Sequence, residues 1–171
     1  ADDGSTKRFT CNVVLQPDVD PNDNVKEILK SFKGSLPFVN GKYIVTIEKD
    51  EVPIMSFDDD NILGTISMSW GNRSNRYNHV TVKFSNKNKQ YREDSISYPD
   101  LSSTEYTDLL AEDNGEKLHT ESTLSGVTTY QQAHDLAEFM VKSSRVSRVI
   151  EFTAQPEAML LVPNDVITVA S

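Results

Sequence analysis

The chain has 171 residues, 26 acidic and 17 basic side chains, and a formal net charge of −9. A chain of this length buries about 70% of its unfolded surface, so one compact domain or two small ones can form without metals or disulfides. The acidic balance argues against tight nucleic-acid binding, which depends on Lys and Arg, and the lone Cys11 excludes an internal disulfide framework. No apolar run is long enough to cross a bilayer.

The first third of the chain predicts a small α/β unit over residues 9–55. Residues 1–8 are small, polar and acidic, and we expect them to be disordered or a terminal edge. A strand is predicted over 9–15, and then a loop to residue 24. Asn24 is the expected cap of a short helix whose apolar positions are Val25, Ile28, Leu29 and Phe32.

A tight hairpin is predicted next. Asn40 and Gly41 supply the positive φ angles that a type I′ turn requires, and apolar residues flank them at 38–39 and 43–47. We expect the preceding helix to pack on this hairpin. Asp58, Asp59, Asp60 and Asn61 then break the pattern, and a β-rich region over 56–171 begins.

Two alternating segments open that region. Residues 66–70 and 80–84 have a period of two, which predicts two strands with one dry face each. Because residues 71–78 connect them, a hairpin is the simplest pairing. Residues 87–98 add a possible third strand. The polar stretch 99–126 is interpreted as a long excursion without a defined element.

The C-terminal part predicts a helix of about residues 130–145, with Thr129 and Gln132 as a capping box. Strands are predicted over 149–153 and over 159–162, the second of them buried on both faces. Residues 163–165 form the expected turn into a last strand over 166–169. Asn164 tolerates the left-handed conformation that such a turn requires.

Taken in order, these segments resemble a known family. An Asp-Asn-Ile-Leu-Gly segment (60–64) leads toward Trp70, and an alternating strand from Asn78 follows. The late helix with its Gln-Gln-Ala start (131–133), the pair Ser144-Arg145 and a closing Pro-x-Asp-Val-Ile-x-Val (163–169) complete the set. The order over roughly 25–170 is similar to that of the lambda-type tail-tip attachment proteins of bacteriophages, which in turn resemble the baseplate hub proteins of contractile phages.

The resemblance implies an α+β fold, mainly an antiparallel β-barrel-like tube domain with one packed C-terminal helix, plus the small α/β unit. It implies a virion structural protein at the tail tip, produced in the host cytoplasm. Its expected partners are two further copies in a trimeric hub, the tail tube or distal tail proteins, and the tape-measure protein. Acidic side chains lining the hub lumen would repel DNA and let it slide, and Asp58, Asp59 and Asp60 are candidates.

The sequence contains no motif that predicts a metal or a cofactor. The histidines at 79, 119 and 134 lack a metal-ligand spacing, and His134 is expected to be a partly covered ring at a helix edge. The alternating oxygen side chains from Asp18 to Asn24 begin like a calcium loop, but Asp23 and Leu29 occupy positions that need Gly and Glu. The Asp58 to Asn61 segment could hold a cation, although a solvated turn is the ordinary explanation.

Catalytic residues are likewise not predicted, and the leading hypothesis is a structural protein and not an enzyme. Cys11 is expected to be a small buried hydrophobe, and Glu151 is the carboxylate to check for a cell-wall hydrolase, the second alternative. The first alternative is a carbohydrate- or receptor-binding module. Its exposed aromatic residues would include Tyr77, Tyr91 and Tyr98, whereas Trp70 is expected in the core.

Overall fold

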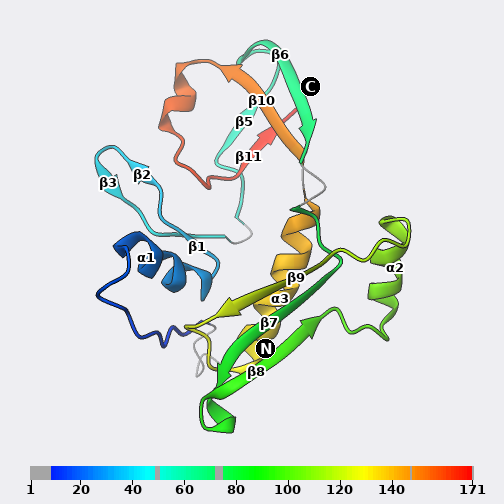
Figure 1. Cartoon of the computed structure of the whole chain (residues 1–171). Helices are drawn as coiled ribbons and strands as arrows, with labels where there is room; N and C mark the ends of the chain where they lie inside the picture. The colour runs from blue at the N-terminus through cyan, green and yellow to red at the C-terminus, as the bar shows by residue number, and fades with distance from the viewer. Residues whose placement is uncertain (1–8, 49–50, 72–74, 147, 171) are drawn as a thin grey trace. The chain divides into compact units, whose positions relative to one another are not determined.

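The computed structural model describes residues 9–48, 51–71, 75–146 and 148–170. By its contacts the chain divides into two compact units (Figure 1). Of the described residues, unit 1 contains 9–33 and 75–146, and unit 2 contains 34–48, 51–71 and 148–170. The units interleave along the chain, and the predicted linear division near residue 55 stays a prediction.

Unit 1 is a three-stranded sheet with a long helix packed on it. Its helices and strands are α1 (Pro21–Lys30), β7 (His79–Asn86), β8 (Arg92–Tyr98), α2 (Thr104–Glu112), β9 (His119–Leu124) and α3 (Tyr130–Arg145). The strand order is β8-β7-β9, with β8 antiparallel and β9 parallel to the central strand. The helix α3 contacts both β7 and β8.

The core of unit 1 follows from two matched periodicities. Every second residue of β7 is buried, and α3 turns one apolar stripe toward the sheet, as residues three and four apart on a helix do. The buried residues in this core are Val80, Val82, Phe84, Ile96, Tyr98, Leu124, Val127, Ala133, Leu136, Ala137 and Val141. The predicted helix and its Thr129 cap are confirmed, since the Thr129 hydroxyl accepts from the Gln132 N–H at 3.4 Å.

The Gln132 side chain holds the N-terminal segment instead of closing a capping box. Its amide nitrogen donates to the carbonyls of Thr10 at 2.8 Å and Ser31 at 2.7 Å, and its oxygen accepts from the Thr10 N–H and hydroxyl. The strand predicted over residues 9–15 is wrong, because these residues have no strand pairing and are held by such side-chain bonds. Asn12 adds one backbone bond to Gly126.

The first helix begins earlier than its predicted cap. α1 starts at Pro21, with Asp20 as N-cap accepting from the Asn22 N–H at 2.7 Å. Proline suits the first helical position because its missing N–H would have no partner there. Asn24, the predicted cap, lies inside the helix and bonds back to Gln16.

Unit 2 consists of short strand pairs. Its elements are β1 (Gly34–Ser35), β2 (Phe38–Val39), β3 (Lys42–Tyr43), β4 (Thr46–Ile47), β5 (Met55–Phe57), β6 (Ile62–Trp70), β10 (Arg148–Ala154), the 3-10 turn η3 (Pro156–Leu160) and β11 (Ile167–Val169). The pairs are β1 with β4, β2 with β3, β6 with β10, and β5 with β11. Of these, only β5 with β11 is parallel.

The two predicted turns of unit 2 are confirmed. Asn40 and Gly41 have φ angles of 51° and 78°, and Phe38 faces Tyr43 across the hairpin. Asn164 adopts φ 77°, and its side-chain amide donates to Ser35 and Thr46. The packing of α1 on the hairpin stays a prediction, because the two lie in different units.

Several predictions of longer range are wrong. Residues 66–70 do not form a hairpin with 80–84, because β6 pairs with β10 and β7 pairs with β8 and β9. The excursion 99–126 contains α2 and β9. The strand predicted over 159–162 is a 3-10 turn and coil with exposed Met159 and Leu160. The fold is a mixed α+β one; no closed barrel is found among the strands that the structure describes, and the barrel-like tube stays a prediction.

Candidate functional site

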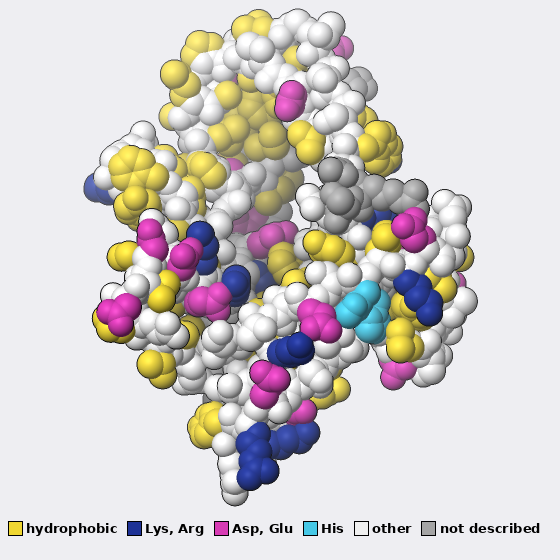
Figure 2. Space-filling view, viewed as in Figure 1, with side chains coloured by type: hydrophobic (Ala, Val, Ile, Leu, Met, Phe, Trp, Pro, Cys, Tyr) yellow, Lys and Arg dark blue, Asp and Glu magenta, His cyan; other side chains and the backbone are white. Residues whose placement is uncertain are grey.

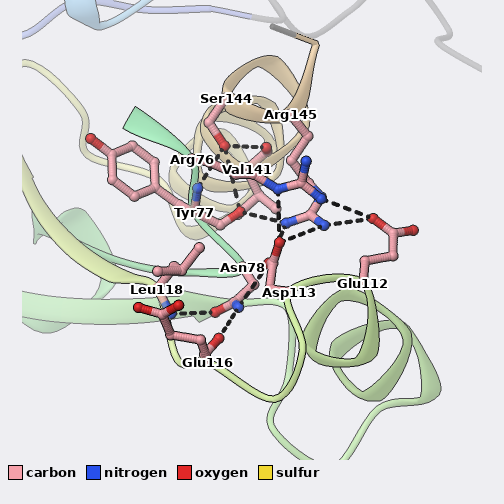
Figure 3. A network of polar contacts seen from close by, with 10 residues as sticks. All are labelled: Arg76, Tyr77, Asn78, Glu112, Asp113, Glu116, Leu118, Val141, Ser144 and Arg145. Carbon is pink, nitrogen blue, oxygen red and sulfur yellow. Dashed lines mark hydrogen bonds and ion pairs between the residues drawn. The ribbon is translucent and has the colours of Figure 1, made fainter. Parts of the chain in front are cut away.

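A cluster of charged side chains joins the ends of four elements in unit 1 (Figure 3). We call it the Arg145 cluster, and its members are Arg76, Asn78, Glu112, Asp113 and Arg145. Arg145 ends α3 and reaches past the end of α2, where Nη1 donates to Asp113 Oδ2 at 2.8 Å and Nη2 donates to Glu112 Oε2 at 2.6 Å. Arg76 Nε forms a second ion pair with Asp113 Oδ1 at 2.8 Å.

Asp113 is the centre of this cluster and is only 3% exposed. Burial would raise the pKa of its carboxyl, but the hydrogen bonds from Arg145 and Asn78 and the charges of Arg145 and Arg76 lower it overall. Burial likewise opposes the charged form of Arg145, yet the bonds to Asp113 and Glu112 raise its pKa above the usual value. A buried charge of this kind is tolerable only when it is paired and hydrogen-bonded.

The cluster also fixes backbone. Asn78 donates to Asp113 Oδ2 at 3.0 Å and to the Glu116 carbonyl at 2.7 Å, while its side-chain oxygen accepts from the Leu118 N–H at 2.9 Å. Next to it, the Ser144 hydroxyl accepts from the Tyr77 N–H at 3.0 Å. These bonds set the positions at which β7 and β9 begin.

Such an arrangement does not fit acid–base or nucleophilic chemistry. A general acid needs a pKa near the working pH, whereas that of Asp113 is lowered below its ordinary acidic range. The Arg145 cluster therefore acts as a structural clamp. Sequence reasoning singled out Ser144 and Arg145 but not their partners, because these lie more than 30 residues away along the chain.

Unit 2 has a different feature, an exposed apolar surface. Met68, Trp70 and Ile150 lie near one end of the β6–β10 ribbon, where Met68 pairs with Ile150 and Trp70 pairs with Arg148. We call these three residues the ribbon patch; Trp70 is 69% exposed, with the Arg148 guanidinium 4.7 Å from its ring centre. The other end of the ribbon is covered, because Phe152 packs on buried Phe57 with ring centres 5.1 Å apart.

A second group of exposed apolar side chains lies on the β2–β3 hairpin. Phe38 and Tyr43 pack ring on ring at 4.9 Å, yet both are well exposed, as is Val45. Figure 2 shows hydrophobic surface gathered over this hairpin. Isolated two-stranded ribbons are marginally stable in water, and contiguous apolar patches typically mark interaction sites. These strand pairs are candidates for an assembly surface.

The structure overturns three predictions about single residues. Trp70 is exposed and not in the core, and Cys11 is exposed and not a buried hydrophobe. Tyr98 is buried, with its hydroxyl donating to Glu105 at 2.7 Å, so it cannot serve on a binding surface. Tyr77 is half-buried against the core, and Tyr91 is exposed as predicted.

The acidic candidates lie in solvated places. Glu151 is exposed on β10 opposite Ser67. Asp58 accepts from the Asp60 N–H at 3.0 Å, and Asn61 Oδ1 accepts from the Asp58 N–H, which makes this segment a turn that leads into β6. In the calcium-like segment, the Asp20 carboxylate is the N-cap of α1 and accepts a hydrogen bond from the Asn22 N–H.

A hollow of about 420 Å³ lies between residues 13–19 and α1. Its charged lining is internally paired, with Lys26 bonded to Asp23 at 2.8 Å and Lys30 bonded to Glu27 at 2.5 Å. Ligand sites present a few convergent polar groups to the ligand, whereas these two lysine side chains are already ion-paired with carboxylates of α1. The hollow therefore does not support a small-molecule site.

The histidines are placed in two different ways. His134 lies at the edge of α3 with its ring against Tyr98, as predicted. His79 and His119 face each other across the parallel β7–β9 pair, which sequence reasoning missed because β9 was not predicted. Burial, and then the charge of His119, lowers the pKa of His79.

No helix within the described ranges has both the length and the apolar character needed to cross a membrane.

Comparison with known proteins agrees with the resemblance. The family model described as "Putative phage tail protein" matches residues 20–171. The baseplate hub protein pb3 of Escherichia phage T5 is 24% identical over 154 residues, and the tip attachment protein J of Escherichia phage SECphi27 is 24% identical over 169 residues. These alignments cover 90% and 98% of this chain but only 16% and 13% of the two relatives, so the chain spans a small part of their length.

Proposed function

This chain belongs to the phage tail protein family, and from that premise we propose that it is a structural segment of a tail-tip or baseplate hub. The observation that carries the proposal is the match over residues 20–171, supported by relatives named as a baseplate hub protein and a tip attachment protein. Its place is the virion tail, and its work is assembly and not turnover of a substrate. The Arg145 cluster supports this reading, because its carboxylates are engaged in ion pairs.

The assembly surface of the proposed segment is on unit 2. The apolar side chains of the ribbon patch and of the hairpin are exposed to water, and we expect a partner to cover them. Burying them would stabilise the complex by roughly 25 cal/mol per Å² of apolar area. The proposed partners are two further copies of the hub chain in a trimer, neighbouring tail-tube or distal tail proteins, and the tape-measure protein. Strands supplied by such partners would extend the open β6–β10 ribbon toward the barrel-like tube.

The acidic turn of Asp58, Asp59 and Asp60 is exposed and belongs to this same unit. If it faces the lumen of the hub, it would repel DNA phosphates over a range of about 8 Å at physiological salt. Neutralising the three residues to Asn tests this step. Slower DNA delivery from assembled particles is expected, and unchanged delivery would show that the acidic turn has no role in DNA passage.

Assembly is tested by a matched pair of variants in the phage or prophage that encodes the chain. Trp70→Ser removes an exposed aromatic residue of unit 2, and Tyr91→Ser removes an equally exposed one of unit 1. We expect at least a tenfold loss of infectious tailed particles with Trp70→Ser and little change with Tyr91→Ser. Equal titres for the two variants would refute the assignment of the surface.

A binding assay separates this function from the alternatives. A hub segment at high concentration is expected to bind no glycan on an array and to clear no cell-wall suspension. Saturable binding to one glycan class, lost on Tyr91→Ser, would favour a carbohydrate-binding module instead.

A further inference from the structure

Two of the three histidines are brought together at one end of the sheet in unit 1. His79 is the first residue of β7 and His119 the first of β9, and the two are register partners in the parallel pair. Their ring centres are 5.0 Å apart, with the planes tilted by 37°. Forty residues separate them in the sequence, so only the parallel pairing makes them neighbours.

One nitrogen of this pair lacks a partner. Nε2 of His79 is buried and has no hydrogen bond to any residue that the structure describes, whereas Nε2 of His119 lies 3.0 Å from the Thr81 hydroxyl. Buried polar atoms are nearly always bonded, and an exception calls for a water, an ion or a functional explanation. The Tyr106 ring of α2 packs edge-on against the His79 ring, with the two ring centres 5.8 Å apart, and supplies no bond to it.

The separation of the two rings fits a shared metal ion. Zinc binds imidazole nitrogen at about 2.0–2.1 Å, so two imidazoles on one ion have ring centres roughly 4.5–5.2 Å apart. We propose that His79 and His119 form a two-imidazole site for a divalent first-row cation of the zinc class, with water completing the coordination. Imidazole suits zinc, copper and nickel, and it does not suit calcium or magnesium.

A rival cluster on α3 is less suited to the ion. Ligand atoms of His134, Asp135 and Glu138 lie within 4.8 Å of one another. Asp135 already accepts from Gln131 at 2.8 Å, and Glu138 is ion-paired with Lys142. This cluster supplies a single imidazole, and a cation there would compete with the two existing partners for the carboxylates.

The site has a structural consequence for unit 1. An ion held by His79 and His119 would cross-link the first residues of β7 and β9. The residues just before these strands are already joined, because Asn78 of the Arg145 cluster accepts a hydrogen bond from the Leu118 N–H. Binding to the folded state alone stabilises by mass action, so zinc should raise the unfolding temperature of this unit. Figure 2 shows histidine surface at the side of the sheet next to α2.

The test uses zinc chloride and the full chain with two matched variants. Titration calorimetry is expected to show one zinc ion per chain, with the affinity reduced at least tenfold by His119→Gln and unchanged by His134→Gln. Glutamine keeps a group that can bond to Thr81, and circular dichroism without zinc shows whether each variant is folded. Loss of binding with His134→Gln but not with His119→Gln would place the ion on α3 and overturn the proposal.

A measurement on the unaltered chain removes any dependence on the folding of variants. Imidazole nitrogen NMR shifts of His79 and His119 are expected to move together on addition of zinc, while those of His134 stay in place. If no imidazole shift moves with zinc at a tenfold molar excess, the pair is a packing contact and the proposal fails.

Discussion

The two units of this chain use their apolar residues in opposite ways. In unit 1, β7 alternates strictly and α3 covers the sheet, so a closed core forms from residues such as Val82 and Leu136. In unit 2, only Phe57 is a buried large apolar residue among those that the structure describes, and Trp70 is in water. The closed core of unit 1 and the uncovered ribbons of unit 2 are the contrast on which the proposed assembly surface rests.

Breaking the Arg145 cluster should have the largest effect on stability. Arg145→Met leaves Asp113 buried with one guanidinium partner fewer, and removing one partner of a buried pair costs about 3–5 kcal/mol. Lys142→Met, one turn earlier on α3 and exposed, is the control and should change the free energy of unfolding by less than about 0.5 kcal/mol. Urea unfolding of both variants measures the difference. Equal stabilities would show that the cluster is not a clamp.

A matched pair of truncations compares the two units directly. Leu136→Ala opens a cavity in the core of unit 1 and should cost about 2–5 kcal/mol. Met68→Ala removes an exposed side chain from unit 2 and should cost less than about 0.5 kcal/mol. If thermal unfolding shows comparable losses, the surface of unit 2 is covered in the isolated chain.

The sequence was sufficient for elements whose signals are local. The stripe on α3, the alternation of β7 and the Asn-Gly turn each repeat within a few residues, and all three were predicted. Trp70 was misassigned because alternation predicts that a strand has a dry face but not whether anything covers it. β9 was missed because its exposed face carries His119 and Glu121, so its composition is that of a loop.

The Arg145 cluster could not be predicted from local sequence patterns. The Arg145 cluster draws on residues near 76, near 113 and at 145, and its members become neighbours through the parallel pairing of β7 and β9 and the packing of α3 on β7. No periodicity in the sequence encodes the partner of a charged residue. The family resemblance included the Ser144-Arg145 pair without indicating its contacts.

The acid response of unit 1 should follow Asp113. Because its pKa is lowered in the folded chain, its ionised form contributes stability that is present above the unfolded value of about 3.9 and is lost as pH falls through the folded value. The Asp113→Asn variant has no ionisable carboxyl at this position. The stability gap between the wild type and Asp113→Asn, measured by urea unfolding, should therefore narrow between pH 6 and pH 3. A constant gap would contradict the assignment.

The turn at Asn164 allows a smaller, local test in unit 2. Asn164→Gly keeps the left-handed conformation but removes the bonds to Ser35 and Thr46, at an expected cost of about 1 kcal/mol. Asn164→Ala loses the same bonds and adds the left-handed penalty of about 1–2 kcal/mol. Protection of the β4 amides against hydrogen exchange should be highest in the wild type, lower in Asn164→Gly and lowest in Asn164→Ala. A higher protection in Asn164→Ala than in Asn164→Gly would refute this prediction.

A small effect on the stability of the isolated chain is expected at Trp70, and this substitution separates folding from assembly. Because the ring is exposed and contacts Arg148, Trp70→Ser should change the unfolding free energy of the isolated chain by no more than about 1 kcal/mol, the range of an exposed cation–π contact. The same substitution is expected to reduce particle assembly at least tenfold. A stable chain that fails to assemble places the role of Trp70 in a contact between molecules. A loss of several kcal/mol in the isolated chain would instead make Trp70 part of the fold.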